Sequence, residues 1–242
     1  MESHQQTLSI AQLQPITEEE RQTVDGLVDS EDIIIREEMD YDVSALRANV
    51  GIVTMNFNAD QQTIYHTIMN AVCKNESLQI FISARGGCGK TYLLNGILDA
   101  VRASESGGCI ALAMASTGIA AELLHLGRTF HSRLKAPLNP NENSTLNITA
   151  QSKLAKLVRR AKLLMIDEVT MLHRFQLEAL DRTLRDLMEK PNAPFGGKII
   201  ILAGDFRQCL PIVVGGNRAQ IVQSCINKSP LWKEFQVYIF IS

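Results

Sequence analysis

Short runs of consecutive apolar residues recur along the chain, and amphipathic stretches separate them. The runs fall at 78–82, 109–114, 163–166, 198–203 and 237–241. Continuous apolar strands that alternate with helices are typical of a parallel sheet covered on both faces. The pattern therefore predicts an α/β fold with a mainly parallel sheet and helices on both of its faces.

Several of the amphipathic stretches predict helices. The longest span 61–74, with Asn58 or Asp60 as its cap, and 172–189. Their expected core positions are Ile64, Ile68, Ala71, Val72, Leu177, Leu180, Leu184 and Leu187. Shorter helices are expected at 33–39, 119–126 and 153–160, a linker after Tyr41-Asp42-Val43, and a long loop at 136–150.

Composition excludes several classes of protein. Hydrophobic residues make up 45% of the chain and charged residues 21%, which is ordinary for a globular protein. No apolar run approaches the ~18 residues of a membrane span, and the polar N-terminus does not resemble a signal peptide. The five cysteines are scattered without Cys-x-x-Cys spacing, so we expect an intracellular protein with neither a disulfide framework nor a zinc site.

Charge is distributed unevenly along the chain. Residues 1–60 carry 13 acids and 3 bases, whereas residues 61–242 carry 13 acids and 21 bases. A basic domain is expected of a protein that binds nucleic acid, although basic charge around a nucleotide cleft gives the same imbalance. We expect residues 1–40 to be a poorly ordered acidic arm and residues 41–242 to form the folded domain.

The stretch Ser83–Thr91 follows the first apolar run and opens a helix. A strand, a glycine-rich turn, Gly-Lys-Thr and a helix in this order are typical of a phosphate-binding loop, with an ordinary turn as the alternative. Backbone N–H groups would bind a polyphosphate, Lys90 would reach its outer phosphates, and Thr91 would bind Mg²⁺. The residues expected to contact the nucleotide are Gly86, Gly87, Cys88, Gly89, Lys90 and Thr91.

Ala84 departs from the usual form of this loop. The usual pattern has a glycine at this position. If the position requires a positive φ, alanine destabilises the loop by about 1–2 kcal/mol; if it does not, alanine is harmless. The sequence leaves both outcomes open.

Two further predicted strands end in polar residues. The third apolar run ends in Asp167 and Glu168, and the fourth is followed by Gly204–Gln208. Ligands of parallel sheets bind beyond the carboxyl ends of the strands. Asp167 would hold Mg²⁺ through a water or together with Thr91, and Glu168 would orient and deprotonate the attacking water. Gln208 would contact the γ-phosphate or that water. Capping of the following helix is the alternative for the two acids.

Ordered motifs make the sequence similar to a known family. They are Gly89-Lys90-Thr91 and the segments 115–121, 127–132, 166–168 and 204–211. Together they resemble the motifs of Pif-type DNA helicases of superfamily one, and segment 177–186 is especially similar to the branch carried by Helitron transposons. The resemblance implies a RecA-like P-loop NTPase domain. It also implies an ATP- and Mg²⁺-dependent 5′-3′ DNA helicase that acts in repair, recombination or transposon replication.

The resemblance also assigns individual residues. Gln61 lies in a segment similar to the family's glutamine motif and would hydrogen-bond the adenine edge, and Arg207 would contact the nucleotide. Single-stranded DNA is the implied partner, because small hydroxyls and cations suit its phosphates. The residues implied to meet DNA are Ser116, Thr117, Gly118, Arg128, His131, Arg133 and Lys135. A structural role is the alternative for His131, and core packing is the expected role of Phe130.

Members of this family continue into a second RecA-like domain, which brings an arginine to the ATP site. The sequence stops at Ser242, just after the fifth apolar run. We therefore expect a truncated chain that unwinds nothing alone, with a partner chain as a source of the second domain. The alternative is a catalytically inert, nucleic-acid-binding remnant of a transposon-derived helicase. Nuclear residence is expected if the source is eukaryotic.

Overall fold

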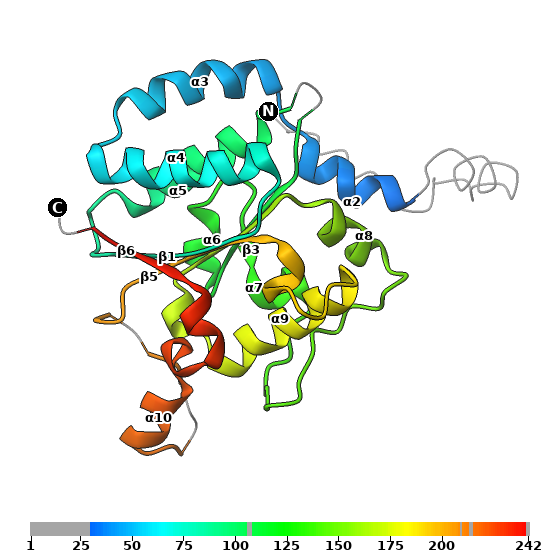
Figure 1. Cartoon of the computed structure of the whole chain (residues 1–242), viewed down its shortest axis with the longest axis vertical. Coiled ribbons are helices and arrows are strands. Elements are labelled where there is room, and N and C mark those ends of the chain that lie inside the picture. Colours follow the sequence, from blue (N-terminus) through cyan, green and yellow to red (C-terminus); the bar gives the residue numbers. More distant parts are fainter. Residues whose placement is uncertain (1–29, 106–107, 209, 213–214, 241–242) are drawn as a thin grey trace, which may run out of the picture.

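A computed structural model of the chain describes residues 30–105, 108–208, 210–212 and 215–240. Its centre is a six-stranded sheet in the order β3-β2-β4-β5-β1-β6 (Figure 1). Every neighbouring pair of strands is parallel, so the predicted sheet is confirmed. The strands are β1 (Leu78–Ala84), β2 (Ala111–Ala115), β3 (Arg128–Thr129), β4 (Leu163–Asp167), β5 (Ile199–Gly204) and β6 (Gln236–Phe240).

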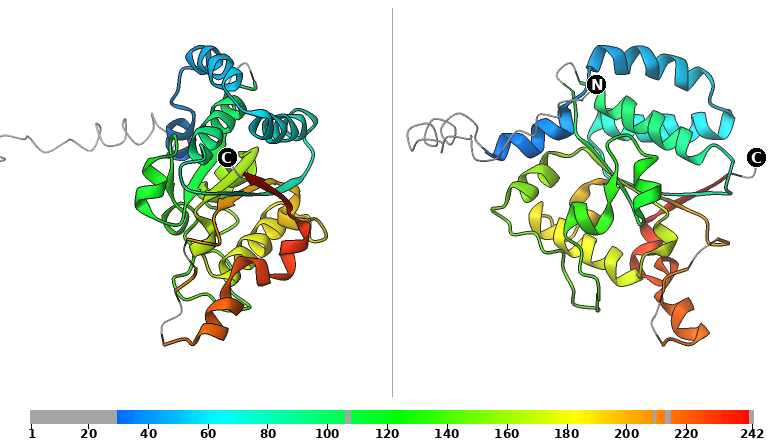
Figure 2. Two further views of the ribbon diagram at one scale, coloured as in Figure 1. Left: turned by 90° about the vertical axis from the view of Figure 1, so that its left-hand side faces the viewer. Right: turned by 180° about the vertical axis from the view of Figure 1, so that it is seen from behind.

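Helices cover both faces of the sheet, as Figures 1 and 2 show, with α3, α4 and α5 on one face and α8 and α9 on the other. The helices are α2 (Ser30–Met39), α3 (Val43–Met55), α4 (Ala59–Lys74), α5 (Lys90–Arg102), α6 (Gly118–Glu122), α7 (Phe130–Leu134), α8 (Lys153–Arg160), α9 (Arg174–Leu187) and α10 (Arg218–Ser224). Short 3₁₀ turns are η2 (Val169–Met171), η3 (Pro194–Gly197), η4 (Ile226–Lys228) and η5 (Pro230–Glu234).

The pleat of the central strands divides the apolar residues between two cores. On β5, Ile199 and Ile201 pack in the core beneath α4 and α5. The intervening Ile200 and Leu202 pack in the core that includes α8 and α9. Successive side chains of a strand point to opposite faces, so a continuous apolar run is what a strand buried on both sides requires.

The two longest predicted helices are confirmed. Asn58 is the N-cap of α4, and it forms a capping box with Gln61: the Asn58 side chain accepts from the Gln61 N–H and the Gln61 side chain accepts from the Asn58 N–H. A similar box joins His173 and Gln176 at the start of α9. All of the predicted core positions of both helices are buried.

The N-terminal part of the domain differs from its prediction. Residues 1–29 of the expected arm lie outside the described residues. Ser30–Met39, however, form a helix packed on the domain, with Glu38 buried. This confirms the short helix expected at 33–39, and the poorly ordered arm does not extend through 40. The expected linker after residue 43 is instead α3, a helix of 13 residues.

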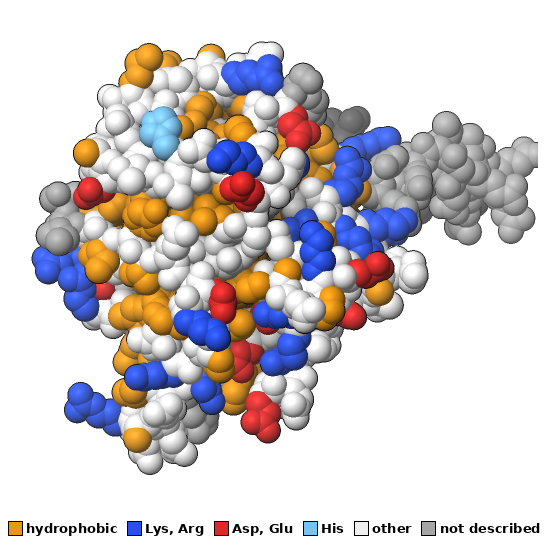
Figure 3. Space-filling view, in the orientation of Figure 1, with side chains coloured by type: hydrophobic (Ala, Val, Ile, Leu, Met, Phe, Trp, Pro, Cys, Tyr) orange, Lys and Arg blue, Asp and Glu red, His pale blue; other side chains and the backbone are white. Residues whose placement is uncertain are grey.

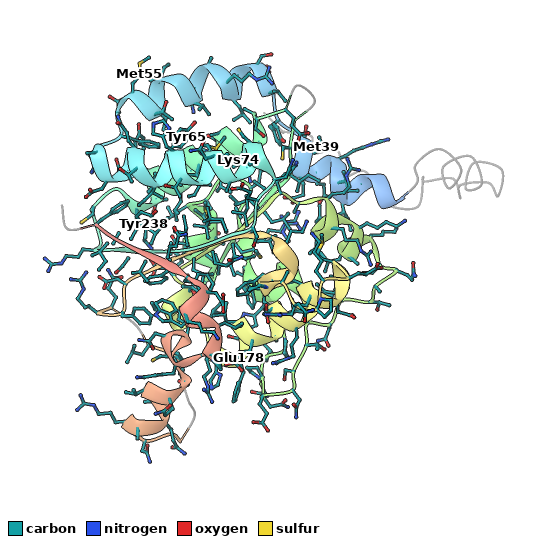
Figure 4. All side chains as sticks on the ribbon, in the orientation of Figure 1. Met39, Met55, Tyr65, Lys74, Glu178 and Tyr238 are labelled. Carbon is teal, nitrogen blue, oxygen red and sulfur yellow. The ribbon has the colours of Figure 1, made fainter. Side chains whose placement is uncertain are left out.

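α3 was not predicted because it buries none of its residues completely. It lies across α5, where a Cβ added at Gly96 would come 3.0 Å from Val53 Cγ1 and 2.7 Å from Phe57 Cζ. Tyr65 of α4 lies between α4 and α3 (Figure 4), with its ring centroid 5.7 Å from that of Phe57. Close packing against one glycine therefore holds a helix that lacks a strong apolar stripe.

Segments near β2 were also predicted incompletely. The helix expected at 119–126 is shorter, because α6 ends at Glu122 and Leu126 adopts a left-handed backbone with φ 56°. The short elements β3 and α7 follow and bury Phe130 completely, which confirms its expected core role. Among the described residues, no helix combines the length and apolar character needed to cross a bilayer.

Candidate functional site

The predicted phosphate loop lies between the end of β1 and the start of α5. Gly87 and Gly89 have φ values of 83° and 76°, a left-handed conformation that glycine adopts without a steric penalty. Gly89 is the N-cap of α5, and Lys90 and Thr91 are the first residues of that helix. The loop therefore presents backbone N–H groups and a helix N-terminus at the carboxyl edge of the sheet.

Ala84 is harmless at its position. It is the last residue of β1, pairs with Phe240 of β6, and is completely buried. Its φ is not among the positive values of the described residues. Because the backbone here is an ordinary strand, the departure from glycine introduces no left-handed strain.

Lys90 joins the phosphate loop to the end of β4. Its Nζ lies 2.5 Å from Asp167 Oδ1 and 2.5 Å from Glu168 Oε1. The side chains of Lys90, Asp167 and Glu168 are 10%, 5% and 25% exposed. Burial alone would lower the pKa of Lys90, but the two carboxylates outweigh it and raise that pKa. Lys90 is thus a charged ammonium held between two acids.

The backbone of Glu168 is left-handed, with φ 50° and ψ 34°. Its N–H donates to Asp167 Oδ1 at 2.7 Å, and its carbonyl accepts from Ser116 Oγ at 2.7 Å. The Ser116 N–H also donates to the Asp167 carbonyl at 3.1 Å. A non-glycine residue in this conformation is strained, and it persists only where its surroundings hold it. Ser116, predicted for DNA, therefore also positions Glu168.

Two predicted glutamines lie against the phosphate loop. A Cβ built on Gly89 would lie 3.0 Å from Gln61 Nε2, and one on Gly86 would lie 3.3 Å from Gln208 Nε2. Gln61 is buried, and its capping box with Asn58 fixes the orientation of its side-chain amide. The structure thus brings residues from α4, β4 and the segment after β5 to one loop.

Arg207 lies beside this group and is half exposed. Its Nε donates to Asp205 Oδ1 at 2.9 Å, and its backbone N–H donates to the same oxygen at 3.0 Å. These hydrogen bonds lower the pKa of Asp205. Gln208 Nε2 also reaches Asp205 Oδ2 at 3.4 Å. Asp205 therefore orients both Arg207 and Gln208, which pattern reasoning did not assign to it.

The residues predicted for DNA do not form one surface. Ser116 and His131 line a cavity of about 420 Å³ together with Gln176, on one side of α7. Arg128 and Lys135 line a second cavity of about 540 Å³ on the other side of that helix. Thr117 and Gly118 begin α6, where the Thr117 side chain accepts a hydrogen bond from the Ala120 N–H.

Arg133 corrects the prediction most clearly. Its side chain is 4% exposed and forms an ion pair with Glu38 of α2, whose side chain is 3% exposed. Burial lowers the pKa of Arg133, and the Glu38 carboxylate opposes this shift. Because a buried guanidinium with an internal partner cannot reach a strand of DNA, we remove Arg133 from the DNA-binding residues. It anchors α2 to α7.

His131 has a definite partner. Gln176 Oε1 accepts from the His173 N–H, which leaves the Gln176 amide nitrogen to donate to His131 Nε2 at 2.5 Å. An Nε2 that accepts a hydrogen bond requires a neutral imidazole ring. Burial lowers the pKa of His131, which also favours the neutral ring. His131 therefore offers a neutral imidazole at the wall of the first cavity, and its Gln176 partner was not apparent from the sequence.

Fold and site geometry together define a phosphate-loop nucleotide-binding domain of the α/β class. The sequence profile of the PIF1-like helicase family matches residues 56–241. The chain belongs to this family.

Individual relatives agree with this assignment. The chain is 36% identical to ATP-dependent DNA helicase PIF4 of Trypanosoma brucei brucei over 139 residues, covering 54% of this chain and 16% of that protein. It is 30% identical to ATP-dependent DNA helicase RRM3 of Saccharomyces cerevisiae over 168 residues, covering 69% and 22%. A crystal structure of Bacteroides Pif1 helicase with ADP-AlF3 and ssDNA superposes with a TM-score of 0.58 at 27% identity, covering 74% of this chain and 42% of that one. The chain thus spans less than a quarter of the length of PIF4 and of RRM3.

Proposed function

We propose that this chain is the ATP- and Mg²⁺-binding domain of a 5′-3′ DNA helicase that acts on single-stranded DNA. The observation that carries the proposal is the contact of Lys90 with both Asp167 and Glu168 beside the phosphate loop. A lysine so placed can leave one carboxylate when a phosphate arrives, because all its partners are anionic oxygens.

The loop Gly86-Gly87-Cys88-Gly89 binds the phosphates through backbone N–H groups in this proposal, and Lys90 contacts the outer phosphates. Arg207 is adjacent in the chain to Gln208, which lies against the phosphate loop, and would bring a second cation to the phosphates. Gln61, oriented by its capping box, hydrogen-bonds the adenine edge. The capping box at Gln61 and the hydrogen bonds from Asp205 to Arg207 support these roles.

Mg²⁺ fits the donors present here. A hydroxyl from Thr91 and a carboxylate from Asp167 are the hard oxygen ligands that this ion takes beside phosphates and water. The described residues hold no cluster of three or more His, Cys, Asp or Glu side chains that could bind a metal alone, so nucleotide oxygens would complete the set. Held by Thr91 and Asp167, Mg²⁺ would supply charge neutralisation at the phosphates.

Glu168 accepts the proton of the attacking water in the proposed mechanism, and Gln208 orients that water or the γ-phosphate. Departure of Lys90 toward the phosphate frees the Glu168 carboxylate for this task. Ser116 keeps the Glu168 backbone in its left-handed conformation by hydrogen bonding to its carbonyl. Ser116 also lines the first cavity. DNA bound in that cavity would therefore contact the residue that positions Glu168.

DNA contacts in this proposal come from Ser116, Thr117, Gly118 and His131 on one side of α7. Arg128 and Lys135 contribute from the other side. In this proposal the helicase acts in DNA repair, recombination or Helitron-type transposon replication. In a eukaryote it would reside in the nucleus.

The test is ATP hydrolysis by the purified chain, with and without single-stranded DNA. Lys90→Ala and Glu168→Gln remove the phosphate contact and the general base, so each should lower the rate by roughly 10²–10⁴-fold. Lys74→Ala, at the exposed end of α4, and Glu189→Gln, at an exposed position just after α9, are matched controls that should leave it unchanged. Hydrolysis that survives both active-site changes would refute the proposal, and DNA binding without hydrolysis would indicate an inert remnant.

A further inference from the structure

An acidic helix lies against the basic part of the domain. α2 contains Glu37 and Glu38, and it packs beside α8 and α7. Lys and Arg side chains gather around α2 and α8 at the right of Figure 3. Two acids of this helix therefore pair with two arginines of the basic part of the chain, Glu37 with Arg128 and Glu38 with Arg133.

A groove of about 540 Å³ runs between α2, α7 and α8, and we call it the α2–α7–α8 groove. Its polar lining includes Glu37, Arg128, Ser132, Lys135 and Ser152, together with Arg133, whose guanidinium is paired with Glu38. His131 and Ser132 are consecutive in α7, yet they line different cavities. The groove is therefore separate from the cavity beside Ser116 and His131, and α7 is the wall between them.

Two ion pairs hold α2 over this groove, and they differ in exposure. Glu38 and Arg133 are both buried, and separating them would leave a charge unpaired in the interior. Arg128 and Glu37 are 3.0 Å apart, with side chains 50% and 53% exposed. An exposed pair of this kind contributes little to stability and exchanges partners readily. Arg128 can therefore change its partner while Glu38 keeps α2 in place.

We propose that the α2–α7–α8 groove is a second contact site for a single-stranded nucleic-acid backbone, in which Glu37 competes with a phosphate for Arg128. The inference rests on the proposed DNA-binding function, in which Arg128 and Lys135 contact the strand, and adds to it a groove beside α2 and α8 and an internal competitor. A strand that contacts His131 on one side of α7 reaches Arg128 and Lys135 by passing over that short helix. Glu37 thereby sets how tightly the second part of the strand is held.

The chemistry of the lining favours phosphates over a folded acidic partner. Arg128 and Lys135 supply cations, Ser132 and Ser152 supply hydroxyls, and the first turn of α8 opens toward the groove. These are the groups that bind phosphate oxygens without reading bases. Ile34 and Leu154 are the two apolar residues of the lining, and charged or polar residues make up the rest.

The experiment measures binding of a labelled oligothymidylate to the whole chain by fluorescence anisotropy across a salt series. Glu37→Gln should bind roughly threefold or more tightly at low salt, because Arg128 becomes available. One additional phosphate contact steepens the slope of log K against log salt by about 0.7, so this advantage should shrink about 2.5-fold between 50 and 200 mM salt. Glu76→Gln, an exposed acid lining another cavity, is the matched control for net charge and should leave the slope unchanged.

Arg128 and Lys135 complete the test. Lys135→Ala should weaken binding and reduce the slope by about 0.7. Arg128→Ala should do the same and abolish the gain from Glu37→Gln when the two are combined. Equal binding by the wild type, Glu37→Gln and Lys135→Ala would overturn the groove while leaving DNA binding itself intact. Absence of binding by every variant would overturn the DNA-binding function as well, and poly-glutamate that displaces the oligonucleotide equally well at matched charge would overturn the choice of nucleic acid.

Discussion

Two clusters of paired charge lie in different parts of the molecule, and water reaches them to different extents. At the phosphate loop, Lys90 bridges Asp167 and Glu168, and the Glu168 side chain is partly exposed. Beneath α2, Glu38 and Arg133 form a pair in which both side chains are buried. The first cluster can exchange its internal partners for those of a ligand. The second cannot open without leaving a charge unpaired in the interior.

The difference shows how similar ionic contacts serve different purposes. Lys90 follows a strand end and a glycine turn, which direct its side chain to an edge where ligands bind. Arg133 lies inside a five-residue helix that another helix covers. The greater exposure of Glu168 therefore distinguishes the Lys90 cluster, which we propose as a ligand site, from the buried Glu38–Arg133 pair, which anchors α2.

The largest expected effect comes from breaking the buried cluster. Arg133→Ala leaves the Glu38 carboxylate buried without its partner, so the free energy of unfolding should fall by about 3–5 kcal/mol. Urea unfolding monitored by circular dichroism measures this change. Arg128→Ala, at the exposed pair, should lower stability by no more than about 1 kcal/mol. Equal losses for the two arginines would contradict the distinction between anchor and exchangeable contact.

A smaller effect is expected at Ser116, which connects the open cluster to the first cavity. Ser116→Ala removes the hydrogen bond to the Glu168 carbonyl, and such bonds contribute about 1 kcal/mol. Turnover of ATP should fall several-fold, whereas the affinity for ATP–Mg²⁺ should remain unchanged because Ser116 does not contact the loop. Steady-state kinetics with a separate binding titration resolves the two quantities. Weaker nucleotide binding with normal turnover would show that Ser116 acts elsewhere.

The smallest effect is expected at Ala84. Restoring the usual glycine places it within β1, where it should lower stability by about 0.5–1 kcal/mol through greater freedom of the unfolded chain. Nucleotide affinity should not improve, because the alanine backbone is unstrained. Thermal unfolding and a nucleotide titration of Ala84→Gly check both points. A marked gain in affinity would mean that Ala84 does constrain the loop.

The sequence predicted the open cluster well, because strand ends and glycine turns have a regular geometry. Apolar runs located β1, β4 and β5, and parallel strands necessarily carry their terminal residues to one edge. Lys90, Asp167 and Glu168 therefore had to lie close together. The direct contact of Lys90 with both acids, and the role of Asp205 in orienting Arg207, depend on side-chain packing that no sequence pattern records.

The buried pair of Glu38 and Arg133, and the positions of the residues around α7, could not be predicted in the same way. Arg128, His131 and Lys135 share a short segment, and which side of α7 each one faces depends on the helices packed around it. The partner of Arg133 lies 95 residues away in the chain, in a segment assigned to a poorly ordered arm. Long-range pairing of charges leaves no periodic signal, so only the fold shows that the residues predicted to bind DNA lie on two sides of α7.

The central claim is that Lys90, held between Asp167 and Glu168, belongs to a nucleotide site. Its most direct test is calorimetric titration of a non-hydrolysable ATP analogue with Mg²⁺ into the wild type and Lys90→Ala, with Lys74→Ala as the control. Loss of a charged hydrogen bond should weaken binding roughly 10–100-fold in Lys90→Ala and leave the control unchanged. Equal affinity of the wild type and Lys90→Ala for the analogue would contradict the account.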